Sequence, residues 1–221
     1  MHGASSGRRR PRSRTPTRSS IRPIAAQQIR LLATPTPNFG IGVKEVQAFN
    51  LLSLDGGFWR NKNGQALIAG GATTDGTCDS ARWLRQYAPL ADLGASASCA
   101  QVASYVSTVI GNASCAGATC NAMLKSQMLI TALNLFFADP TMGDATVDLV
   151  HTCANPPSCT VSEDASAAFG GATSRTVAQL LSDAASQSNV GGSSWYGQVK
   201  STQVLAKDVF AAINALMASS P

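Results

Sequence analysis

The sequence has little charge, only two histidines and no long apolar run. Charged residues make up 13% of its 221 positions, about half the usual share, and Ala, Ser, Gly and Thr take their place. The longest apolar-looking stretch, residues 128–138, includes Thr131 and Asn134. It is much shorter than the roughly 20 residues that a membrane-spanning helix needs, so we expect no membrane span.

Acidic residues are absent from the first 30 positions, where eight arginines lie. The remaining chain holds the other nine basic residues and all 12 acidic ones, so its formal charge is −3 although the whole chain carries +5. We expect residues 1–38, rich in Arg, Ser, Pro and Thr, to form a disordered basic tail. Such an arm can bind nucleic acid through phosphate contacts, but no aromatic residue is interleaved to stack on bases. We therefore favour a solvated tail and treat nucleic acid as an unfavoured partner.

Cysteine is absent outside residues 78–159. Six cysteines lie inside that window, namely Cys78, Cys99, Cys115, Cys120, Cys153 and Cys159. Their even number, with Ala, Ser, Gly and Thr as neighbours, predicts disulfides and an oxidising compartment. Among the 15 possible connectivities we favour nearest-neighbour pairing. The alternative is a zinc site of four thiolates, but the residues between the closely spaced cysteines do not form zinc knuckles.

An export signal is also missing, which conflicts with the compartment that the cysteines indicate. Residues 1–30 have a basic region but no apolar stretch follows it, and Arg9-Arg10 is followed by Pro and more Arg. Two explanations remain open. Either the chain is a fragment or has a misassigned start, with its signal upstream, or the protein is cytosolic and its cysteines are reduced. We favour the first, because low charge with many small polar residues is typical of secreted bacterial modules.

Helical periodicity dominates the body, in which 44% hydrophobic residues suffice for a core. Ser98 and Gln101 have the spacing of a capping box. We predict an all-α domain over residues 39–221, a single bundle of five to seven helices with Gly-rich loops and local disulfides. Its clearest helical segments, with apolar residues at i, i+3, i+4 and i+7, are 98–110, 121–138, 174–188 and 198–218.

Three further segments have weaker patterns. The glycines of residues 55–65 indicate turns. Residues 145–150 alternate loosely, which fits a short strand or a ragged helical turn. Ser162 has the position of an N-cap for a short helix that ends at Gly170-Gly171.

One stretch of the body resembles the Gly-Phe/Tyr-Trp-x-Asn signature of an uncharacterised module in bacterial secreted and cell-surface proteins. That stretch is Gly57-Phe58-Trp59-Arg60-Asn61-Lys62-Asn63-Gly64-Gln65. The resemblance implies an extracellular setting, and it implies no reaction because no activity is established for the family. Such modules often stand at the end of longer exported proteins. Further similar blocks, which extend the resemblance over about residues 54–218, are 118–128, 166–173, 187–197 and 205–214.

Candidate catalytic and metal sites are few. His151 and Cys153 would share one face of a strand, but we favour a surface histidine beside a disulfide. Asp139, Asp144 and Asp148 lack the order of a calcium loop, and we favour solvated loop acids. We therefore expect no metal and no cofactor. A carboxylate pair that hydrolyses glycans has no support in residue spacing, although two acids can meet in space from anywhere in the chain.

Four large aromatic residues stand beside glycines and polar groups: Phe58, Trp59, Trp195 and Tyr196. Exposed on a rigid loop, they would suit recognition of sugars or proteins. Packed inward, they would anchor loops to the helical bundle, which is the interpretation that we favour.

The favoured function is a non-catalytic extracellular or cell-surface module for adhesion, assembly or spacing within a larger exported protein. Its partner would be a cell-wall or extracellular polymer or another surface protein. One alternative is an extracellular glycan hydrolase with an unrecognised carboxylate pair, whereas another is a nucleic-acid binder that uses the arginine arm.

A thiol titration under denaturing, non-reducing conditions tests the disulfide prediction. We expect no free thiol, because the prediction pairs all six cysteines. Six free thiols would contradict both the disulfides and the oxidising compartment.

Overall fold

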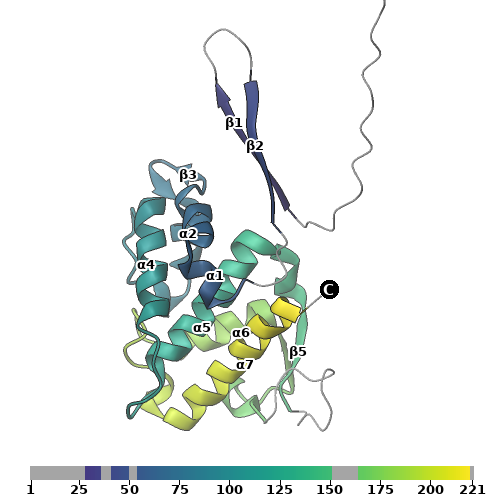
Figure 1. The fold of residues 1–221 in the computed structure, drawn as a ribbon. Helices are drawn as coiled ribbons and strands as arrows, with labels where there is room; N and C mark the ends of the chain where they lie inside the picture. The colour runs from purple at the N-terminus through teal and green to yellow at the C-terminus, as the bar shows by residue number, and fades with distance from the viewer. Residues whose placement is uncertain (1–27, 36–40, 50–53, 151–163, 220–221) are drawn as a thin grey trace, which may run out of the picture.

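The computed structural model describes residues 28–35, 41–49, 54–150 and 164–219, which form a mainly helical body with three two-stranded sheets (Figure 1). Within these ranges, no helix has both the length and the apolar character needed to cross a membrane. The α-helices of the described ranges are α1 (Gly56–Arg60), α2 (Lys62–Ala69), α3 (Asp79–Leu84), α4 (Cys99–Gly111), α5 (Asn121–Leu133), α6 (Val177–Ser186) and α7 (Lys200–Ser219).

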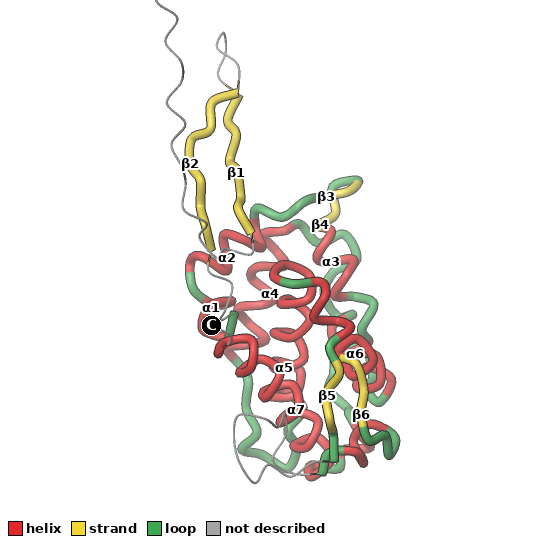
Figure 2. Tube along the Cα trace, turned by 90° about the vertical axis from the view of Figure 1, so that its right-hand side faces the viewer, coloured by secondary structure: helices red, strands yellow, loops and turns green. Residues whose placement is uncertain are grey.

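Helix α5 lies at the centre of the body, where both α4 and α7 pack against it (Figures 1 and 2). Ten of its 13 residues are buried, and Leu124, Met128 and Leu133 have no exposed surface. Burial of each of these side chains stabilises the fold by about 1.5–3 kcal/mol. The helix continues as one π-helical turn, Asn134–Ala138, which ends before Pro140. The predicted helix at 121–138 therefore corresponds to the most buried part of the chain.

Two helices begin at capping boxes. Ser98 Oγ accepts from the backbone N–H of Gln101, whose side chain accepts from the Ser98 N–H. Thr176 and Gln179 form the same arrangement at the start of α6. Such caps satisfy N–H groups that have no partner inside the helix, so local sequence sets these boundaries. The predicted helices at 98–110, 174–188 and 198–218 correspond to α4, α6 and α7.

Residues 57–65, the signature segment, lie in the two short helices α1 and α2, although their glycines predicted turns. Trp59 on α1 is fully buried, and its indole Nε1 donates to Asn134 Oδ1 at 3.1 Å. Asn61 begins α2 as its N-cap, accepting from two backbone N–H groups. Gly64 allows α2 to approach α1 closely, because a Cβ there would lie 2.3 Å from the Phe58 carbonyl oxygen. Burial of Trp59 and close backbone packing therefore stabilise helices too short to persist alone.

Three antiparallel strand pairs make the all-α prediction only roughly right. Strand β1 includes part of the predicted tail, whereas residues 1–27 lie outside the described ranges. Strand β5 shows that residues 145–150 contain a short strand, whose partner lies about 30 residues later in the chain. The pairs are β1 (Gln28–Pro35) with β2 (Ile41–Phe49), β3 (Thr73–Thr74) with β4 (Thr77–Cys78), and β5 (Thr146–Asp148) with β6 (Ser174–Thr176).

The predicted short helix before Gly170 is a single 3-10 turn, Ser166–Phe169. It ends where Gly170 adopts a left-handed conformation with φ of 68°, which glycine accommodates without strain. Its predicted N-cap, Ser162, lies outside the described residues.

The described residues contain two disulfides, Cys78–Cys99 and Cys115–Cys120, and both join nearest neighbours as predicted. The first links the start of α3 to the start of α4, and the second closes the loop before α5. The third predicted pair, Cys153 and Cys159, lies outside the described residues.

Gly64→Ala tests the close approach of α1 and α2. We expect the free energy of unfolding to fall by about 1–3 kcal/mol, because the new Cβ overlaps the Phe58 carbonyl and forces the helices apart. Urea denaturation measures the change. The matched control is Gly117→Ala, where a Cβ would meet nothing within 4 Å and stability should be unchanged or slightly higher. Equal stability of both variants would contradict the packing argument.

Candidate functional site

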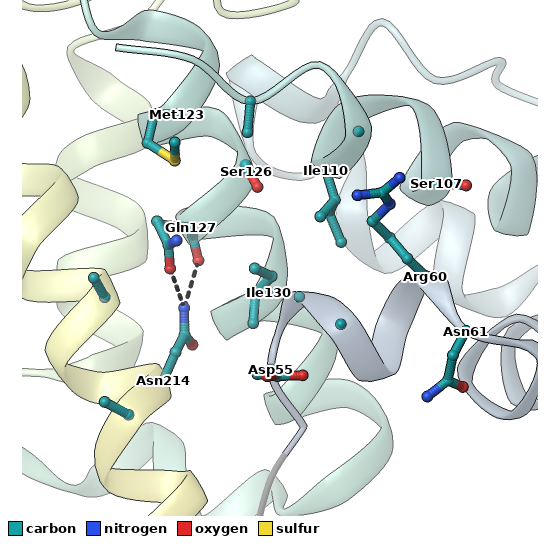
Figure 3. Close-up of a pocket in the computed structure, with 16 residues that line it drawn as sticks. Asp55, Arg60, Asn61, Ser107, Ile110, Met123, Ser126, Gln127, Ile130 and Asn214 are labelled. Carbon is teal, nitrogen blue, oxygen red and sulfur yellow. Dashed lines mark hydrogen bonds between the residues drawn. The ribbon is translucent and has the colours of Figure 1, made fainter.

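An open groove of about 980 Å³ is bounded by α1, α4, α5 and α7 (Figure 3). This volume lies at the upper end of the range for ligand sites. Helices α5 and α7 supply its polar floor, the end of α4 supplies apolar side chains, and α1 forms a charged rim. The groove therefore exists because four helices meet without filling the space between them.

A hydrogen-bonded amide pair holds one side of the groove in a single arrangement. Asn214 Nδ2 donates to the Gln127 backbone oxygen at 3.1 Å and to Gln127 Oε1 at 2.9 Å. Asn214 Oδ1 in turn accepts from Thr131 Oγ1 at 2.9 Å. Asn214 is 5% exposed, so these bonds form largely out of water and fix its orientation. Gln127 Nε2 is the end of the pair that remains able to donate.

Ser126 contributes a hydroxyl to the floor. The residue is 2% exposed, yet its side chain lines the groove and its oxygen points into it (Figure 3). The described residues bury three side-chain atoms without a partner, Asn121 Oδ1, Asn134 Nδ2 and the Tyr196 hydroxyl; Ser126 Oγ is not one of them and is accessible from the groove. Ile110 and Ile130 lie beside it and present aliphatic surface to the same space.

The rim carries one acid and one base from the two ends of α1. Asp55 is the N-cap of the helix, with Oδ1 accepting from the Phe58 N–H at 2.7 Å. Arg60 is exposed and lies over Gly111, so that a Cβ on that glycine would sit 3.7 Å from the guanidinium. Within the described ranges, its guanidinium has no ion-pair or hydrogen-bond partner.

The groove contains one carboxylate, which also caps a helix. A cavity of about 250 Å³ contains a single acid, Asp183, which pairs with Arg175 at 3.0 Å. A third cavity, of about 500 Å³ beside Trp83, has no acid in its lining. For the part of the chain that the structure describes, none of these three cavities places two carboxylates together.

The four aromatic residues lie mainly in the core. Trp59 and Trp195 have no exposed surface, and Tyr196 is 9% exposed. The Trp195 indole donates to the Ala184 carbonyl at 2.7 Å, so it anchors the preceding Gly-rich loop to α6. Phe58 is half-buried and packs edge-on against Trp59. These four residues therefore do not form an exposed recognition surface in the described structure. Burying their large apolar area stabilises the fold.

The loop acids have local structural roles. Asp139 accepts from the Thr141 N–H at 2.9 Å, and Asp148 accepts from the Val150 N–H at 3.0 Å. The described residues contain no group of three or more His, Cys, Asp or Glu side chains that could hold a metal ion. Predicted candidates His151 and Cys153 lie outside those residues.

Sequence reasoning missed the groove residues Ser126, Gln127 and Asn214. A weak signal was present, since each is a polar residue within a strongly apolar helical segment. Only the packing of α5 against α7 shows that Gln127 and Asn214 meet.

A second polar cluster ties α4 and α5 to two loops. Lys125 Nζ donates to Asp92 Oδ2 at 2.7 Å and to the Gly191 carbonyl at 2.9 Å. Tyr105 donates its hydroxyl to Asp92 Oδ1 at 2.6 Å, and Lys125 Nζ lies 5.3 Å from the Tyr105 ring centre. Burial, followed by the hydrogen bond and negative charge of Asp92, raises the pKa of Tyr105 above its usual value. Burial likewise raises the pKa of Tyr87 to about 12.

Stability should fall as pH rises from about 10 towards 12. The folded protein keeps Tyr87 and Tyr105 protonated where the unfolded chain loses their protons, so their stabilisation is complete below pH 10 and is lost above it. The slope contributed by each tyrosine is at most about 1.4 kcal/mol per pH unit. Urea denaturation at a series of pH values measures it, and Tyr87→Phe should flatten the curve. An unchanged slope in that variant would contradict the assignment.

Comparison with known proteins finds no matching family model, no matching curated protein and no matching solved structure.

Proposed function

We propose that the chain is a non-catalytic extracellular or cell-surface module that serves in adhesion, assembly or spacing within a larger exported protein. The observation that carries the proposal is the structural use of the signature residues. Trp59 is buried and bonded to Asn134, Asn61 caps α2, and Gly64 admits the packing of two helices. A signature whose members maintain the fold is typical of a module defined by its shape and surface.

The two disulfides support the extracellular part of the proposal. Cys78 and Cys120 have no exposed surface, so each bridge includes a sulfur inside the body. Disulfides of this kind form and persist in oxidising compartments.

No specific observation favours either alternative. A glycan hydrolase needs two carboxylates across a scissile bond, whereas Asp55 alone provides a carboxylate to the groove. The arginine arm that would bind nucleic acid lies almost wholly within residues 1–27, outside the described ranges.

A turnover assay tests the non-catalytic part of the proposal. The full chain, incubated with soluble glycan and peptide panels, should release no product above a buffer blank by mass spectrometry, because its only groove carboxylate serves as a helix cap. Asp55→Asn is the matched variant, since an amide oxygen still caps the helix. Product formation by the original chain that disappears in Asp55→Asn would overturn the proposal.

A further inference from the structure

We propose that the groove binds an extended peptide segment of another protein, with an aliphatic side chain flanked by one acidic and one basic residue. This inference rests on the proposed function in one respect, because it expects the peptide to be bound and not cleaved.

The Ser126 hydroxyl is the first reason to expect a ligand. The residue is 2% exposed, and its side chain lines the groove with the oxygen pointing into it (Figure 3). A hydroxyl in this position can donate to one ligand group and accept from another.

The fixed Gln127 amide indicates what the ligand presents. Asn214 occupies Gln127 Oε1, and Thr131 holds Asn214 in place, so Gln127 is left with Nε2 as a donor. A donor in this position suits a carbonyl oxygen, while Ser126 accepts from an N–H or donates to a second carbonyl. Peptide backbone supplies both kinds of group at regular intervals.

The aliphatic wall indicates a side chain for the same ligand. Gly56 leaves Ile110 and Ile130 uncovered, because a Cβ there would lie 3.1 Å from Ile130 Cδ1 and 3.3 Å from Ile110 Cγ2. Met123 adds a flexible thioether that adapts to different shapes. No aromatic residue occurs in the described lining, so the platform on which sugar rings commonly stack is not supplied there.

Charge complementarity sets the flanking residues. Asp55 and Arg60 stand at opposite ends of α1 on the groove rim, and Arg60 has no partner among the described residues. An acidic ligand residue would pair with Arg60, and a basic one would pair with the Asp55 oxygen that Phe58 leaves open. The opposite signs also give the peptide a preferred direction across the groove.

Fluorescence anisotropy with defined peptides tests the inference. The probes are fluorescein-labelled Ser-based nonapeptides with a central Leu, one Lys on one side of it and one Asp on the other. One to three residues separate each charged residue from the Leu. Peptides with Lys first and peptides with Asp first are both included. We expect one arrangement to bind, its scrambled form not to bind, and a central Ala to weaken binding about tenfold.

A charge exchange at the rim separates recognition from folding. Arg60 is exposed, so Arg60→Glu should leave the fold intact. It should lower the affinity for the Asp-bearing peptide about tenfold or more. Replacing that Asp by Lys in the peptide should restore binding to Arg60→Glu, which a merely structural effect would not do. Arg82→Gln, on α3 and outside the groove lining, is the matched control and should bind like the original chain.

The contrary outcomes are distinct. If no patterned peptide binds better than its scrambled form, the peptide inference is overturned and the non-catalytic proposal stands. Binding of N-acetylglucosamine oligosaccharides that is lost in Arg60→Glu would show that the groove binds a glycan, and it would also overturn the inference. Cleavage of a bound peptide would instead overturn the non-catalytic function.

Discussion

The burial of helix α5 is the constraint on which the rest of the structure depends. The helix loses solvent on nearly every side, so polar groups along it gain hydrogen bonds from neighbouring elements. Asn134, just beyond its end, receives the Trp59 indole, and Thr131 meets Asn214 of α7. At its start, the Cys120 N–H donates to the Gln203 side chain of α7 at 2.6 Å. These buried bonds place α1 and α7 around one central helix.

The groove is a consequence of the same arrangement. Gln127 of α5 and Asn214 of α7 form the fixed amide pair, whereas Ser126 faces the groove that α1 and α4 also line. Glycine at position 56 keeps that space open, because a side chain there would press on Ile110 and Ile130. The candidate binding surface is therefore built from rigid helices, while the buried Trp59 and the close packing at Gly64 maintain the spacing between them.

The sequence predicted the features that depend on neighbours in the chain. Helix α4 was predictable because Ser98 and Gln101 complete its capping box three residues apart. Nearest-neighbour pairing predicted Cys115–Cys120, whose loop is short enough to close locally. Helix α1 was missed because five residues do not form a stable helix alone, and Trp59 gains its burial from distant segments. Strand β5 was ambiguous because its partner, β6, lies far along the chain.

The sequence by itself determined the helical character of the body, its capped helix starts and the short-range pairing of Cys115 with Cys120, because each follows from residues close together in the chain. Only the tertiary structure decided which polar residues serve the fold and which line a cavity. Gln127 and Asn214 are separated by 87 positions, and their contact exists only once α5 and α7 pack. The same packing turned Trp59 and Trp195 into core residues, since the free energy of burying a large aromatic side chain depends on surroundings that its neighbours in sequence do not provide.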